Sequence, residues 1–292
     1  INIIKPNEVK YDTAMLFISG GSNNSGPPSK ADDIAVALAK GTNSVVAELK
    51  MIPNQPLIFH NDGEERTEDD LIAYTWAQYV KTGDETWPAR LPMVKAAVKA
   101  MDTIQTFMKE ERAGGIDIEN FVVAGGSKRG WTTWLTGAVD PRVEAIVPIV
   151  IDVLNVEVSM QHHHDAYGFW SPAVGDYVRH EMVTKAAPPQ YDALLDIVDP
   201  YRYRHRLKMP KYVVNAGNDQ FFLPDSSQFY YDELEGEKRL RYVPNAGHGL
   251  DGSTALQDIQ AYYHANLEDK PRPEYDWTFG DDGSIHVTAE QK

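Results

Sequence analysis

The sequence has 292 residues and a formal net charge of −15 at pH 7, and its length suits one large globular domain. The negative charge disfavours nucleic acid and anionic membranes as partners. No apolar run approaches the ~18 residues that a membrane helix needs, and the absence of cysteine excludes disulfides, thiol catalysis and cysteine-ligated metals.

The N-terminal part of the chain predicts two buried strands, residues 14–18 and 45–49, with a glycine-rich loop after the first. This loop, residues 19–24, resembles the Gly-rich loop with which esterases bind a developing oxyanion. We therefore expect Gly21 or Ser22 to supply one backbone oxyanion donor. A phosphate-binding loop is the rival interpretation, but the G-K-[ST] ending of such loops is missing here.

Two helices are expected next, over residues 69–80 and 91–108. Thr67 and the acidic residues after it resemble a capping box, which is typical of a helix start. In the second segment, apolar side chains recur at steps of three and four residues, which predicts one buried face. These side chains are Val94, Val98, Met101, Ile104 and Met108.

Ser127 lies in a glycine-rich turn between an apolar run, residues 121–124, and a helix-like stretch, residues 131–138. α/β-Hydrolases present their nucleophilic serine on such a turn, where glycines relieve steric crowding and the helix start favours negative charge. The usual pattern is G-x-S-x-G, but Arg129 occupies the second glycine position here. We expect the backbone N–H of Lys128 to be an oxyanion donor. An ordinary strand-to-helix turn is the alternative interpretation.

Two later strand candidates each end in a turn that carries a polar side chain. Residues 211–215 precede Asp219, and residues 239–243 precede His248. The order serine, acid, histidine is that of α/β-hydrolases, whose sites lie past the carboxyl ends of their strands. We therefore expect Ser127 to be the nucleophile and His248 its base, because imidazole titrates near neutral pH. Asp219 would orient the imidazole.

Two other aspartates compete for the role of the acid. Asp152 follows an apolar run, residues 145–151, and so also stands past a strand end. Asp225 follows Asp219 closely, but its context is more typical of a helix cap. An isolated aspartate at a strand end is most often a turn former, so the assignment of Asp219 depends on the order of all three groups.

The alternation of strands and helices predicts an α/β-hydrolase fold, with a mostly parallel sheet and helices on both faces. We expect residues 1–154 and 204–269, which end in a helix at 256–267, to form this core. Residues 155–203 interrupt the alternation and predict a helical lid or cap. The tail, residues 270–292, carries short strand-like pieces and predicts the start of a small β module.

The lid segment contains aromatic side chains that suit a substrate pocket, and also three consecutive histidines, residues 162–164. A metal site is one interpretation of the histidines. Adjacent residues do not share a helix face, however, so we expect no metal and no cofactor.

Several segments resemble the PhoPQ-activated pathogenicity-related proteins. They are residues 49–56, 125–134, 151–155, 166–170 and 218–225. The resemblance covers nearly the whole chain and implies an α/β-hydrolase fold with catalytic roles for Ser127, Asp219 and His248. It also implies a secreted or periplasmic protein. The chain begins with Ile1 rather than methionine, so we expect a removed leader, and further sequence after Lys292.

The function expected from these features is that of a serine hydrolase that cleaves a carboxylic ester, small or polymeric, through an acyl-enzyme. Arg129, Trp131 and Trp170 are the expected substrate-binding side chains. The serine turn is also similar to that of the glucuronoyl esterases, where a basic residue follows the nucleophile, which implies an acidic-sugar ester. A prolyl-oligopeptidase-like peptidase and a non-catalytic secreted signalling or binding protein are the alternatives. The sequence does not indicate which oligomeric state the protein adopts.

Overall fold

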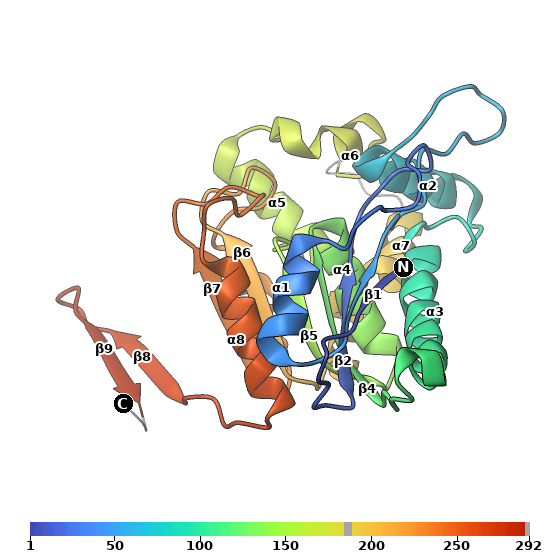
Figure 1. The fold of residues 1–292 in the computed structure, drawn as a ribbon. Helices are drawn as coiled ribbons and strands as arrows, with labels where there is room; N and C mark the ends of the chain where they lie inside the picture. The colour runs from blue at the N-terminus through green and yellow to red at the C-terminus, as the bar shows by residue number, and fades with distance from the viewer. Residues whose placement is uncertain (184–188, 290–292) are drawn as a thin grey trace.

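The computed structural model describes residues 1–183 and 189–289, within which seven strands form one sheet (Figure 1). The strand order is β1 (Asn2–Ile4), β3 (Val46–Leu49), β2 (Thr13–Ile18), β4 (Asn120–Gly126), β5 (Val143–Ile149), β6 (Lys211–Ala216) and β7 (Lys238–Val243). β1 pairs antiparallel with β3, and the other neighbours are parallel. The strands predicted from the sequence are confirmed, and β1 is added at the edge.

Helices cover both faces of this sheet, as predicted (Figure 1). α1 (Asp33–Thr42) and α8 (Ala255–Leu267) pack on one face, while α3 (Arg90–Met108) and α4 (Lys128–Val139) pack on the other. Successive strand residues point to opposite faces, so Met15 joins the core under α1 and Leu16 the core under α3. Because both faces are buried there, the central strands β2, β4 and β5 are nearly continuous apolar runs.

The segment between β5 and β6 forms a helical roof near the carboxyl ends of the strands (Figure 1). Its elements are α5 (Val156–Tyr167), the 3-10 helix η2 (Pro172–Val174), α6 (Gly175–Arg179) and α7 (Pro189–Val198). The 3-10 helix η3 (Pro200–Arg206) then packs along α4 on the way to β6. The earlier helix α2 (Glu68–Thr82) completes this roof, because the Tyr177 ring of α6 lies 5.5 Å from the Trp76 ring of α2. The roof thus comes from two parts of the chain.

Three short 3-10 helices connect the remaining elements: η1 (Glu111–Ala113), η4 (Ser226–Phe229) and η5 (Tyr231–Glu233). None of the helices in the described part of the chain is long and apolar enough to cross a membrane. After α8, the chain leaves the body and forms a separate antiparallel pair, β8 (Tyr275–Phe279) and β9 (Ile285–Ala289) (Figure 1). The strand-like pieces of the tail are therefore strands, and the β module that they would begin stays a prediction.

Candidate active site

Ser127 occupies a strained turn between β4 and α4, with φ +55° and ψ −125°. A non-glycine residue adopts positive φ at an energetic cost, so the surroundings must hold it there. The N–H of Ser127 donates to the Ile149 carbonyl at 2.7 Å, and its own carbonyl accepts from Trp131 at 3.0 Å. A Cβ on Gly125 would stand 2.7 Å from the Arg129 carbonyl oxygen, so this glycine lets strand and helix approach closely.

His248 and Asp219 form a directly bonded pair at the ends of β7 and β6. The Nδ1 atom of His248 lies 2.8 Å from Oδ2 and 3.0 Å from Oδ1 of Asp219. Asp219 also accepts the N–H of Phe221 at 2.8 Å, and its side chain is 3% exposed. With Nδ1–H donated to the carboxylate, Nε2 is left as the basic nitrogen of the ring.

Ser127 and His248 line the same open groove. Its walls include buried side chains of β5 and α8, such as Ile149 and Ile259, and also the exposed residues Ile34, Gly249 and Asp251. The structure therefore brings the serine and the histidine of the sequence prediction to one surface, with the Asp219 carboxylate behind the imidazole.

Of the competing acids, Asp152 is held by other partners. It accepts the hydroxyls of Tyr230 at 2.6 Å and Tyr242 at 2.5 Å and is 3% exposed. Burial raises its pKa to about 7, although both tyrosine hydrogen bonds oppose this. Asp225 instead faces His162, with Nε2 to Oδ1 at 3.0 Å. Asp219 is thus the acid in contact with His248.

The raised pKa of Asp152 predicts a pH-dependent penalty on stability. The ordinary pKa is 3.8, so between about pH 4 and pH 7 the unfolded chain loses a proton that the folded chain retains. Stability then falls as pH rises through this window, by roughly 1.4 kcal/mol for each unit of pKa shift. Asp152→Asn removes the titration. We expect the unfolding free energy of the variant, measured in urea, to rise relative to that of the wild type between pH 4 and pH 7. Parallel pH curves would contradict this.

The two cations after the serine are both paired with the start of α2. Arg129 donates through Nη1 and Nη2 to the two carboxylate oxygens of Glu68, at 2.8 and 2.7 Å. Lys128 Nζ lies 2.9 Å from Glu68 and 3.0 Å from Asp69. Burial favours a raised pKa for Glu68, but the Arg129 hydrogen bond and both positive charges outweigh it and lower the pKa to about 2. The predicted contact between Arg129 and substrate stays a prediction.

The same cluster reaches the predicted oxyanion loop after β2. A Cβ on Gly20 would lie 2.6 Å from Nη2 of Arg129, so a larger residue here would displace this guanidinium. Gln55 donates to the Gly21 carbonyl at 3.0 Å and to Glu68 at 2.5 Å. We call Gln55, Glu68, Lys128 and Arg129 the elbow cluster. It connects the serine turn with the loop that carries Gly21 and Ser22.

The capping box expected at Thr67 is not formed, because the Thr67 side chain makes no capping hydrogen bond. The backbone N–H of Glu68 donates instead to Oε1 of Gln55 at 2.7 Å. Glu68, which the sequence placed in a capping box, therefore binds the other residues of the elbow cluster instead. Sequence reasoning missed Gln55 and Glu68. The available signal was the placement of two consecutive cations at a helix N-terminus, where the dipole disfavours them unless they have acidic partners.

The predicted substrate-binding tryptophans occupy different places. Trp131 is 4% exposed and lines a second, aromatic pocket beside Ser127. Trp170 packs within the roof, its ring 5.8 Å from that of His163 and 4.9 Å from that of His164. The described residues contain no group of three or more metal-ligating side chains, and His162 faces Asp225 instead.

Sequence comparisons relate the chain to known proteins. A model of the family described as PhoPQ-activated pathogenicity-related protein matches residues 1–292. Autocrine proliferation repressor protein A from Dictyostelium discoideum is 44% identical over 300 residues, which cover 99% of this chain and 60% of that protein. The chain therefore spans about 60% of the length of this curated relative.

Solved structures share the fold at low sequence identity. Acetyl xylan esterase from Paenibacillus sp. R4 has a TM-score of 0.57 and 14% identity, covering 91% of this chain and 78% of that chain. Acylaminoacyl peptidase from Pyrococcus horikoshii has a TM-score of 0.59 and 14% identity, covering 92% of this chain and 40% of that chain. At such identities the likeness shows the fold alone, which is that of the α/β-hydrolases.

Proposed function

We propose that this chain, which belongs to the family of PhoPQ-activated pathogenicity-related proteins, is a serine hydrolase that cleaves carboxylic esters through an acyl-enzyme. The observation that carries the proposal is the Asp219–His248 pair, at 2.8 Å, in the same groove as the strained Ser127. Each group stands at the end of its own strand, in the order that α/β-hydrolases use. The substrate is a small or polymeric ester, and a secreted or periplasmic location stays a prediction.

The chemistry follows from the roles that these groups can take. His248 Nε2 accepts the proton of the Ser127 hydroxyl, and the oxygen attacks the ester carbonyl. The oxyanion that forms accepts hydrogen bonds from the N–H of Lys128 and from an N–H of the loop with Gly21 and Ser22. His248 then gives its proton to the departing alkoxide. A water molecule repeats the sequence on the acyl-enzyme and releases the acid.

A panel of chromogenic substrates tests the reaction class. We expect the protein to hydrolyse p-nitrophenyl esters faster than aminoacyl-p-nitroanilides, because p-nitrophenolate is a better leaving group than p-nitroanilide. The reverse preference would favour the peptidase alternative. Absence of turnover on both classes would favour a non-catalytic binding or signalling protein.

A substitution in the elbow cluster is expected to lower turnover, although its side chain does not touch the reacting atoms. Glu68→Gln leaves the positive charges of Lys128 and Arg129 without their shared carboxylate and loosens the oxyanion loop. Because a displacement of about 1 Å can cost ~100-fold in rate, we expect kcat to fall roughly 10- to 100-fold with a smaller change in KM. The measurement is steady-state hydrolysis of a p-nitrophenyl ester.

The matched control is Asp70→Asn, on the same helix turn. Asp70 pairs with Arg179 and His180 in the roof and not with the elbow cluster. We expect this variant to keep kcat within about threefold of wild type. Equal losses in both variants would mean that α2 acts only through general stability.

A further inference from the structure

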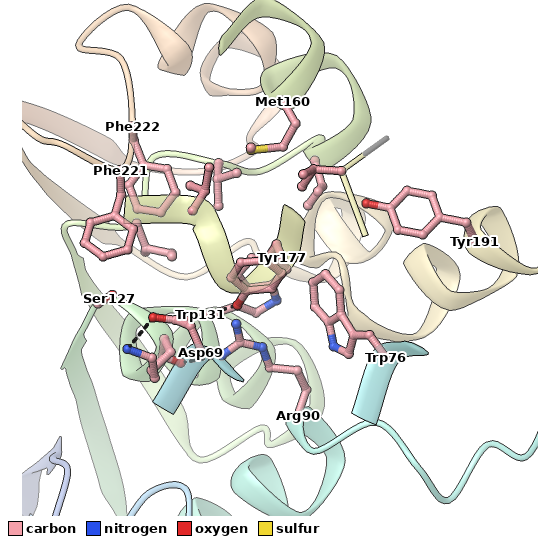
Figure 2. A pocket seen from close by; sticks show the side chains of 16 residues that line it. Asp69, Trp76, Arg90, Ser127, Trp131, Met160, Tyr177, Tyr191, Phe221 and Phe222 are labelled. Atoms are coloured by element: carbon pink, nitrogen blue, oxygen red, sulfur yellow. Dashed lines mark hydrogen bonds and ion pairs between the residues drawn. The ribbon is translucent and has the colours of Figure 1, made fainter. Parts of the chain in front are cut away.

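Ser127 lies where two spaces of different character meet. One is the open groove with His248, described above. The other is a narrow pocket between the serine turn and the roof (Figure 2). Its wall is built mainly from buried apolar and aromatic side chains. They include Trp76, Trp131, Val156, Met160, Val174 and Tyr191.

Charged side chains stand at the base of this pocket. Asp69 accepts the hydroxyl of Tyr177 at 3.1 Å and faces Lys128 Nζ at 3.0 Å, as the dashed lines from Asp69 in Figure 2 show. The guanidinium of Arg90 is fully buried, lies 4.3 Å from the Trp131 ring centre and donates to the Lys128 carbonyl at 2.8 Å. The rest of the wall is mainly apolar and aromatic, so the pocket favours an apolar group.

The position of His248 decides which half of an ester enters which space. The imidazole must give its proton to the oxygen of the leaving alcohol, so the alcohol lies on the His248 side of the serine. His248 lines the open groove and is not among the residues that line the aromatic pocket. Phe221 stands between them, because it lines the pocket while its ring lies 4.4 Å from that of His248.

The linings of the two spaces agree with this orientation. Lys128, the residue after the nucleophile, lines the aromatic pocket and not the groove. The groove contains exposed residues such as Ile34 and Asp251, so a large polar alcohol fits there without desolvation.

We infer that the aromatic pocket is an acyl pocket and that the substrates are esters of apolar acids larger than acetic acid. This inference rests on the proposed function. An acetyl group would contact little of the apolar wall of this pocket, whereas a medium-length or aromatic acyl group would bury its surface against the roof.

The test compares p-nitrophenyl acetate, hexanoate and benzoate, which share one leaving group. We expect wild type to hydrolyse hexanoate or benzoate with kcat/KM at least ~10-fold above acetate, a ratio typical of extra methylenes in an apolar pocket. Val174→Phe fills the pocket from the roof. It should lower the ratio of the larger ester to acetate by at least ~10-fold. Met160→Trp provides a second filling variant if the first does not fold.

Val158→Phe is the matched control, because Val158 is 43% exposed on α5 and lines neither the pocket nor the groove. It should keep the wild-type preference. Hydrolysis that favours acetate in wild type, or a preference that neither filling variant shifts, would overturn the acyl-pocket assignment while leaving a serine esterase intact. Failure of wild type to hydrolyse any of the three esters would contradict the proposed function itself.

Discussion

Replacing Ser127 with alanine is expected to lower kcat/KM for p-nitrophenyl esters by ~10⁴-fold or more, the scale of effect that follows loss of a triad member. Ser127 makes no capping hydrogen bond through its side chain, so the variant should fold with nearly unchanged unfolding free energy. The positive φ of the turn strains alanine and serine alike. Loss of activity without loss of stability is therefore the expected combination, and the two measurements are ester hydrolysis and urea denaturation.

Ser44→Ala serves as a control, because it should lower stability without lowering activity. The Ser44 hydroxyl is buried and bonds to Thr42 at 2.7 Å and to Tyr263 at 2.8 Å, far from the serine turn in the fold. Its removal should cost about 1 kcal/mol of stability and leave turnover unchanged. An Ser127→Ala variant that retains a tenth or more of wild-type activity would mean that another group is the nucleophile.

Replacing Asp219 with asparagine is expected to lower kcat by about 10⁴-fold. The carboxylate accepts the Nδ1 proton of His248 and thereby keeps Nε2 basic. An amide in its place presents an N–H donor to Nδ1 and favours the wrong imidazole tautomer. The volume of the side chain is unchanged, so the loss reports the tautomer and charge rather than packing.

Asp152→Asn is the matched control for this experiment. Asp152 also stands past a strand end, and sequence alone left it as a competitor for the role of the acid. In the structure its oxygens accept the hydroxyls of Tyr230 and Tyr242. We expect this variant to keep kcat within about threefold of wild type. A larger loss for Asp152→Asn than for Asp219→Asn would reverse the assignment of the acid.

The sheet and its main helices could be predicted because their signals are local. Strands buried on both faces are continuous apolar runs, and the helix predicted over residues 91–108, which the structure has as Arg90–Met108, repeats its apolar positions along one face. The structure confirms both. β1 escaped prediction because three half-buried residues at an edge carry no periodic pattern. α1 is not among the predicted elements, although Asp32 caps it by accepting the N–H groups of Ile34 and Ala35.

Chain order and strand ends were enough to nominate Ser127, Asp219 and His248, since a parallel sheet brings the carboxyl ends of its strands together. The ion-pair partners of the two cations beside the serine were not predictable in this way. Glu68 lies 61 positions before Arg129, on a helix that joins the roof, and no periodicity relates the two. The aromatic pocket is equally non-local, because its walls come from α2, the serine turn and the roof helices. Only the folded arrangement shows that the cations beside the serine are already paired.

Labelling with a fluorophosphonate probe, followed by mass spectrometry of the digested protein, tests the central claim most directly. A competent triad would attach the phosphonyl group to the peptide that contains Ser127, and the adduct would be missing from Ser127→Ala and strongly reduced in Asp219→Asn. Folded wild-type protein that takes up no probe, or an adduct located on another residue, would contradict the account.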